Sequence, residues 1–433
     1  MGIACAAGFT VASLLCASAQ SIEEMVLFRV LQGSFGAALV PLSQAVLLDS
    51  YSLAERGSAM AIWGVGVMLG PIMGPTLGGW LTDSYSWYWV FLINLPIGAI
   101  TVIGLMVFMD DTKAVAIRRF DWFGFLSLAI GIGALQIMLD RGEIAGWFSS
   151  SEIVTELIIS IAGFYFFFTH SFTTDNPFVR FAIFRDRNFV SGMVFMAFIG
   201  VVLFGTMSLT SPFMQNVLGY PITTAGWLLG SRGVGTLVSM LLIGRLLRFV
   251  EARWLILTGL ALLAGTLYQM ENFTDQTTSH TIVAVSIVQG FGIGLVFVPL
   301  TTIAFLSIAP ELRTEGTAML TLVRNIFSSI GISGVIAELT NTATVMHARL
   351  VENVTPFNNA LQMPDVASTL NLATDTGKAL LDQIVTQQAT IIAYANDFKL
   401  LMLLAIVAMP LVLLMGSSRS VQGPQEAAAH AMD

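Results

Sequence analysis

Charged side chains are scarce in this chain of 433 residues: they make up 11% of it, whereas hydrophobic residues make up 55%. So few charges cannot cover the surfaces of the roughly three soluble domains that the length alone would suggest. With 19 Lys and Arg against 27 Asp and Glu, and no basic cluster, a nucleic-acid partner is not expected either. The composition predicts a protein of the lipid bilayer.

Cysteine is almost absent, and metal-binding or nucleotide-binding patterns are lacking. Cys5 and Cys16 are eleven residues apart in one apolar stretch, which on a helix separates them by about 16 Å, too far for a disulfide. The four histidines lie on different segments, and the stretch 376–379 lacks the glycine and hydroxyl residue of a phosphate-binding loop. We therefore expect no metal or other cofactor and no enzymatic activity.

Twelve apolar runs approach the length of about 20 residues that a helix needs to cross a bilayer, where each backbone N–H and C=O must be satisfied within the segment. They lie at 2–19, 25–48, 59–80, 88–109, 122–139, 153–171, 189–210, 224–244, 254–270, 281–306, 316–340 and 396–416. The sequence thus predicts an all-α polytopic membrane protein.

Lys and Arg are distributed unevenly among the connections between these runs. If the runs cross the membrane one after another, twelve Lys and Arg fall on the connections and termini of one side and three on those of the other side. Because positive residues accumulate on the cytoplasmic side, we expect both termini in the cytoplasm and the 55-residue connection 341–395 outside. The run 2–19 has an alternative interpretation as a cleaved signal peptide, since Ala17-Ser18-Ala19 resembles a cleavage site, but nothing basic precedes it.

An internal repeat divides the chain into two related halves. Three short motifs recur at offsets of 257 to 259 residues: Gln32-Gly33 as Gln289-Gly290, Pro41 as Pro299, and 57–60 as 316–319. Such repeats are typical of secondary transporters, in which the substrate path lies between the halves. In the first half the repeat lies in 25–48 and 59–80, which are the second and third runs of the chain. In the second half it lies in 281–306 and 316–340, which are the fourth and fifth of the six runs that begin at 189.

If the halves were once equal, the first has lost two helices and an extra pair at 122–171 separates them, so that 12 of an expected 14 spans are present. Genuinely asymmetric halves are the alternative. We expect an incomplete N-terminal bundle at 1–108, an inserted helix pair with linkers at 109–188, a six-helix C-terminal bundle at 189–416 and a cytoplasmic tail at 417–433.

One run carries an unusual pattern of glycine and proline. Its members are Gly66, Gly70, Pro71, Gly74, Pro75, Gly78 and Gly79. Glycines every four residues form a face that a neighbouring helix can approach closely, and each proline removes a backbone hydrogen bond and bends the helix. The pattern favours a seal or hinge between moving bundles, with tight packing alone as the alternative.

Polar residues within the apolar runs mark the candidate transport path, because an intramembrane charge usually has a partner or a hydrated route. They are Arg29, Gln32, Gly33, Arg232, Arg324 and Asn325. Arg29 and Arg232 are alternatively helix-end charges that reach the interface. Carboxylates suited to proton coupling are few: Asp49, Asp121 and Asp140 lie at span ends, and Glu338 is a weak candidate near the outer end of its helix.

Two of these patterns resemble motifs of a known family. Arg29-Val30-Leu31-Gln32-Gly33 is similar to the R-x-x-Q-G motif, and the run from Gly66 to Gly79 is similar to the antiporter motif, of the 14-span EmrB/QacA-type drug:proton antiporters in the major facilitator superfamily. The stretches 137–142, 147–150, 346–347 and 356–358 also resemble EmrB proteins. The first two helices of that family, which include a proton-linked acid, have no counterpart in this chain.

The resemblance implies a multi-pass exporter of the bacterial inner membrane, which exchanges protons for hydrophobic or amphipathic drugs and confers drug resistance. It also implies a periplasmic adaptor and an outer-membrane channel as partners, with 341–395 as a docking surface or a passive cap. Within that segment Leu380-Leu381, Ile384-Val385 and Ile391-Ile392 predict an amphipathic helix that enters the last span. The alternatives are a truncated product that cannot transport and a transporter for a single metabolite.

Overall fold

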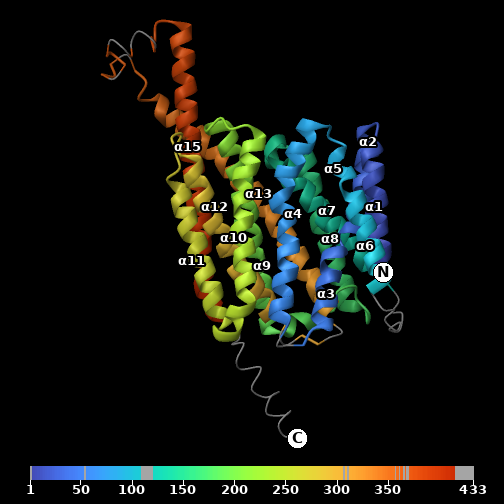
Figure 1. Ribbon diagram of the computed structural model, residues 1–433. Helices are drawn as coiled ribbons and strands as arrows, with labels where there is room; N and C mark the ends of the chain where they lie inside the picture. The colour runs from blue at the N-terminus through green and yellow to red at the C-terminus, as the bar shows by residue number, and fades with distance from the viewer. Residues whose placement is uncertain are drawn as a thin grey trace.

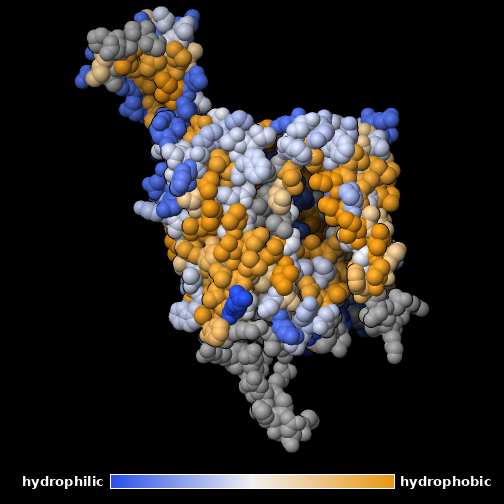
Figure 2. Space-filling model, in the orientation of Figure 1, coloured by the Kyte–Doolittle hydropathy of each residue, from blue (hydrophilic) through white to orange (hydrophobic). Residues whose placement is uncertain are grey.

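The computed structural model describes residues 2–414 apart from 53–54, 109–119, 306–307, 310–311, 356, 360, 364–365 and 367–369. All the regular elements in the described part of the chain are helices, and most run side by side in one elongated bundle (Figure 1). On the face shown in Figure 2, apolar residues form a band across the bundle, and polar residues gather toward its two ends. This distribution suits a bilayer, in which only the ends of the helices meet water.

The first part of the chain folds into six helices. They are α1 (Gly2–Ser18), α2 (Ile22–Gly36), α3 (Leu39–Ser50), α4 (Arg56–Ser84), α5 (Trp89–Leu92) and α6 (Asn94–Phe108). The predicted span 25–48 is thus divided at Ala37 and Ala38. The inserted pair forms the hairpin of α7 (Trp122–Ala145) and α8 (Ser151–Thr173), which pack closely because Gly131 and Gly163 face each other.

The second part contains six long helices. They are α9 (Arg187–Pro212), α10 (Ile222–Phe249), α11 (Ala252–Glu271), α12 (Ser279–Ala304), α13 (Arg313–Val351) and α15 (Asp375–Leu411). Several begin at side-chain caps, which satisfy the first free N–H groups of a helix. Asp186 accepts from the N–H of Phe189 at the start of α9, and Thr374 accepts from the N–H of Gly377 at the start of α15.

Nine helical segments in the described part of the chain are long and apolar enough to cross a membrane. Gly2–Ser18 and Ser58–Val67 are shorter apolar helices, and α11 has the length of a span. The number twelve therefore stays a prediction, while the all-helical membrane architecture is confirmed.

The last two long helices extend well beyond the predicted spans 316–340 and 396–416. α13 continues to Val351, and α15 begins at Asp375, so the predicted amphipathic helix is continuous with the last span. The first part of α15 rises beyond one end of the bundle, which we call the projecting end (Figure 1). There His347 Nε2 lies 3.0 Å from Asp382 Oδ1 and joins the two helices.

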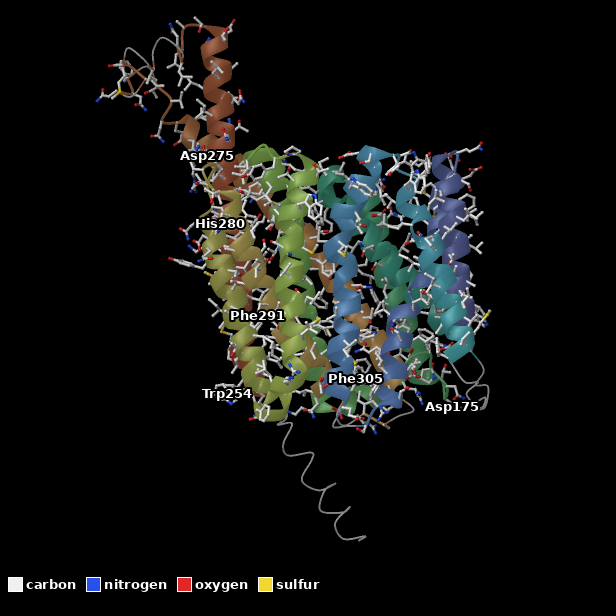
Figure 3. The ribbon with its side chains drawn as sticks, in the orientation of Figure 1. Asp175, Trp254, Asp275, His280, Phe291 and Phe305 are labelled. Atoms are coloured by element: carbon white, nitrogen blue, oxygen red, sulfur yellow. The ribbon has the colours of Figure 1, made fainter. Side chains whose placement is uncertain are left out.

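The two ends of the bundle can be followed in Figure 3. Asp275 and His280 lie at the projecting end, whereas Trp254, Phe305 and Asp175 lie at the opposite end. The unequal distribution of Lys and Arg predicts that the projecting end faces the outside.

The hydrophobic core lies mainly in the second bundle, where Phe189, Phe213 and Phe297 are fully buried. Hydrogen bonds between described residues join this bundle to the first one. Thr317 Oγ1 on α13 donates to the carbonyl of Pro41 on α3 over 3.1 Å, and Arg313 Nη1 lies 3.4 Å from the carbonyl of Leu48.

Candidate functional site

A cavity of about 960 Å³ lies between the two bundles and the inserted pair. Its walls come from α2 and α3, from α7, from α13 and from the segment 176–179. Most of the lining is apolar. The volume of the cavity lies at the upper end of the roughly 300–1,000 Å³ range of small-molecule sites. Because Asp121, Asn176 and Thr314 line it, the cavity reaches the opposite end of the bundle.

Aromatic rings line the cavity at that end. Phe120, Phe125 and Phe178 form a triangle with ring centroids 5.4 to 5.7 Å apart and tilted or edge-on planes. Such a cluster offers apolar area with little loss of side-chain entropy when it binds a ligand.

The two carboxylates beside these rings already have partners. Glu315 forms an ion pair with Arg180, in which the Nε to Oε1 distance is 2.8 Å. Asp121 accepts from the N–H groups of Gly124 and Phe178 and lies 2.9 Å from His170 Nε2. Burial raises the pKa of Asp121, but these hydrogen bonds and the neighbouring imidazole outweigh it and hold the pKa below its ordinary value. The cavity therefore offers apolar surface rather than an unpaired charge.

The predicted R-x-x-Q-G residues form a polar network inside the first bundle. Arg29 Nη1 donates to Gln32 Oε1 over 3.0 Å, and Gln32 Nε2 donates to Ser13 Oγ over 2.7 Å. Asn94 Nδ2 lies 3.4 Å from the same hydroxyl, and the guanidinium of Arg29 stands 4.8 Å from the centroid of the Phe91 ring. The network joins α1, α2, α5 and α6.

The glycine face of α4 meets open space along most of its length. A Cβ atom at Gly66, Gly70, Gly74 or Gly78 would have no described atom within 4 Å, and one at Gly79 would lie 3.8 Å from Ile222. The side chains of Pro71 and Pro75 lie outside the described residues. No described helix is in close contact with the centre of this face, so the alternative of tight packing gains no support.

Arg232, on α10, is 3% exposed, and none of its guanidinium nitrogens has a hydrogen-bond partner among the described residues. Arg324, on α13, reaches Asn325 Oδ1 over 3.4 Å. Neither residue lines the large cavity. The predicted site residues therefore occupy separate places: the network of α2, the open face of α4, the interior of α10 and one stretch of α13.

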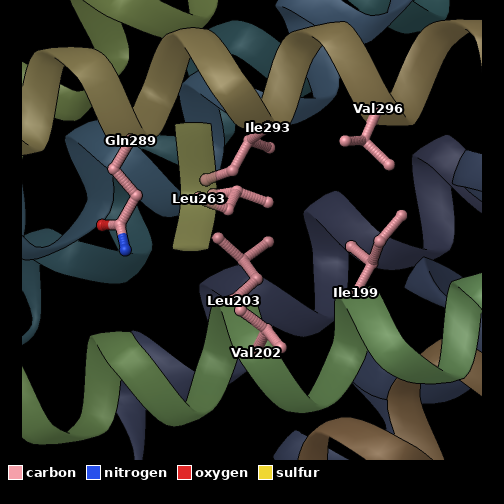
Figure 4. Close-up of a pocket in the computed structure, with 7 residues that line it drawn as sticks. All are labelled: Ile199, Val202, Leu203, Leu263, Gln289, Ile293 and Val296. Atoms are coloured by element: carbon pink, nitrogen blue, oxygen red, sulfur yellow. The ribbon is translucent and has the colours of Figure 1, made fainter. Parts of the chain in front are cut away.

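A much smaller void lies inside the second bundle, between α9, α11 and α12 (Figure 4). Its volume of about 20 Å³ is sufficient for one water molecule. Gln289 is its one polar lining residue, beside six aliphatic side chains. The void belongs to the packing of this bundle and cannot hold a drug-sized molecule.

Asp397 is a candidate that the sequence analysis missed. It lies on α15 with none of its surface exposed. The signal was present in the spacing, because Ala389, Ala393, Asp397 and Leu401 recur every four residues on one buried stripe. A predicted span that began at 396 placed this acid at the membrane boundary and concealed it.

Comparison with known proteins defines the family. Residues 1–332 match the family described as the Major Facilitator Superfamily. The chain belongs to the Major Facilitator Superfamily. It is 34% identical to the multidrug export protein EmrB of Escherichia coli over 90% of this chain and 76% of that protein. It is 32% identical to the fatty acid resistance protein FarB of Neisseria gonorrhoeae over 94% of this chain and 81% of that one.

A solved structure agrees with this assignment at the level of the fold. The human organic anion transporter MFSD10 superposes with a TM-score of 0.55 at 14% identity, over 93% of this chain and 76% of that one. The resemblance to EmrB-type transporters of the superfamily is thus confirmed. With its apolar helices, the chain is a multi-pass protein of the bacterial inner membrane and a transporter rather than an enzyme.

Proposed function

We propose that this chain exports hydrophobic or amphipathic compounds, including drugs, in exchange for protons. The apolar cavity of about 960 Å³ between the two bundles is the observation that carries the proposal. Its position at the end predicted to be cytoplasmic suits the uptake of compounds from that side. The names of two relatives, the multidrug export protein EmrB and the fatty acid resistance protein FarB, support this substrate class.

Alternating access requires the bundles to move against each other, and the contacts between them suit such a motion. The hydrogen bonds from Thr317 to the carbonyl of Pro41 and from Arg313 to the carbonyl of Leu48 are each worth only about 0.5–3 kcal/mol in net terms. In the proposal the open glycine face of α4 receives a neighbouring helix in another state of the cycle. Arg29, Gln32, Gly33, Arg232, Arg324 and Asn325 serve the path or its coupling.

The part of α13 and α15 beyond the projecting end provides a surface for a partner protein. In the proposal it meets a periplasmic adaptor that leads to an outer-membrane channel, while the proton gradient supplies the energy and no cofactor is used.

Filling the cavity tests the proposed function. Gly133 lines the cavity on α7, and a Cβ atom there would meet open space, so Gly133→Trp places a large ring in the cavity without an immediate clash. We expect inverted membrane vesicles that contain the unchanged chain to show proton-driven ethidium transport, and vesicles that contain this variant to lose it.

Gly104→Trp is the matched control. Gly104 lies on α6, has equally open surroundings and does not line the cavity. Its tryptophan variant should transport ethidium like the unchanged chain. Equal activity of the Gly133 and Gly104 variants would contradict a role for the cavity, and an inactive unchanged chain would contradict the proposed function itself.

A further inference from the structure

Asp397 is a buried carboxyl group without a partner inside the second bundle. Neither Oδ1 nor Oδ2 has a hydrogen-bond partner among the described residues, and the side chain is completely buried. Among the acidic residues whose burial the structure describes, only Asp397 is buried. An ionised carboxylate in such surroundings costs several kcal/mol of desolvation that nothing here compensates. A bound proton removes this cost.

The charged groups around Asp397 favour the same outcome. Glu338, from α13, is close enough to repel an ionised Asp397, and its own Oε1 accepts from Thr342 Oγ1 over 2.8 Å. Two carboxyl groups in mutual repulsion favour a state in which one of them holds a proton.

Among the described residues, the other elements packed against α15 place no compensating charge beside Asp397. On α11, Glu271 is paired with Lys399 at 3.5 Å, so this lysine is directed to Glu271. α9 carries no ionisable side chain apart from Arg187, at its far end, and Tyr394, one turn before Asp397 on α15, is uncharged when its phenol is protonated.

Asp397 lies near the projecting end of the bundle. The ring of Phe213, just after α9, is 5.3 Å from that of Tyr394, and the ring of Phe273, just after α11, is 6.5 Å from that of Phe398. Both α9 and α11 finish at the projecting end, where Asp275 lies (Figure 3). The charge distribution predicts that this end faces the outside, from which a proton-driven exporter takes up its protons.

We propose that Asp397, with Glu338 beside it, binds a proton that this transporter exchanges for its substrate. A hydronium ion transfers its proton to Asp397, so that one O–H bond forms on the carboxyl group and a water molecule is left. The proton returns to water when the interface of α13 and α15 becomes hydrated later in the cycle. This inference rests on the proposed exchange of drugs for protons and names the group that takes part in it.

Infrared spectroscopy of the purified chain tests the protonated state without any substrate. At neutral pH the spectrum should contain the C=O stretching band of a protonated carboxyl group, which shifts in D₂O. Asp397→Asn should remove this band, and Glu271→Gln, which alters an acid of the same region that is paired with Lys399, should leave it in place. A spectrum that Asp397→Asn does not change would overturn the proposal.

Transport by proteoliposomes supplies the second arm, with ethidium as the probe. Asp397→Asn should lose ethidium accumulation driven by a pH gradient but retain ethidium counterflow, which needs no net proton movement. Asp397→Glu, which restores a carboxyl group, should recover gradient-driven transport with a displaced pH profile. Undiminished gradient-driven transport by Asp397→Asn would overturn the proposal, as would a loss of both activities together with an unchanged infrared band.

The two arms separate this inference from the proposed function. If the unchanged chain moves no ethidium, the proposed function fails, while the infrared comparison still decides whether Asp397 holds a proton.

Discussion

The Gln-Gly pair that marks the repeat occurs in very different surroundings in the two bundles. In the first bundle Gln32 connects Arg29 to Ser13 through two hydrogen bonds, and a Cβ atom at Gly33 would meet open space. In the second bundle Gln289 Oε1 has no partner among the described residues, and a Cβ atom at Gly290 would lie 1.9 Å from the carbonyl oxygen of Arg232. One copy of the motif builds a polar network and the other a close helix contact.

The same difference extends over whole helices. In the first bundle, 6% of the residues in the most apolar stretch of Trp89–Phe108 are buried, and 11% in that of Ile22–Leu48. In the second bundle, the corresponding shares are 61% in Arg187–Val217 and 67% in Ser279–Ala304. A loosely packed bundle beside a dense one suggests that the second bundle moves as a rigid body. In the proposed transport cycle, the first bundle adjusts its contacts with α10, α13 and the lipid. The following substitutions test this comparison, from the largest expected effect to the smallest.

Replacing the glycine of each Gln-Gly pair with alanine should give the largest difference in stability between the two bundles. Gly290→Ala forces a Cβ atom into the backbone of α10 and should destabilise the protein by about 3 kcal/mol or more, as overpacking of a dense core does. Gly33→Ala should leave stability almost unchanged. Thermal unfolding of the purified variants in detergent measures both, and equal melting temperatures would contradict the difference in packing.

Substituting the glutamine of each Gln-Gly pair should change stability less than the glycine substitutions do. Only the substitution in the first bundle should lower stability. Gln32→Ala leaves Arg29 and Ser13 without their shared partner and should cost about 1–3 kcal/mol. Gln289→Met replaces an amide that faces an apolar void and should be neutral or slightly stabilising. The same melting experiment applies, and a larger loss for Gln289→Met than for Gln32→Ala would reverse the comparison.

The sequence predicted the long helices well because a membrane span depends on a local property, about 20 consecutive apolar residues. The amphipathic pattern at 380–392 also predicted the first part of α15, but no pattern predicted that α13 continues to Val351. The polar first part of α15 and the end of α13 are held by contacts such as His347 with Asp382, which hydropathy does not reveal.

For the candidate site, the sequence identified polar residues but not their partners. The sequence places Arg29 and Gln32 in one motif, and only the fold shows that Ser13 and Asn94 complete their network. The large cavity was beyond prediction, because it is formed by residues on α3, α7 and α13 that are distant in sequence. Asp397 was missed because the predicted span began at 396 and placed this acid at the membrane boundary, whereas α15 begins at Asp375.

Spin-label distances across the two ends of the bundle test alternating access most directly. After Cys5 and Cys16 are replaced by serine, one pair of labels at Asp83 and Asp275 reports on the projecting end, and another pair at Ser52 and Phe249 reports on the opposite end; all four residues are exposed. When ethidium and a pH gradient are applied in liposomes, one distance should shorten while the other lengthens. Two distances that stay fixed, or that change in the same direction, would contradict the account.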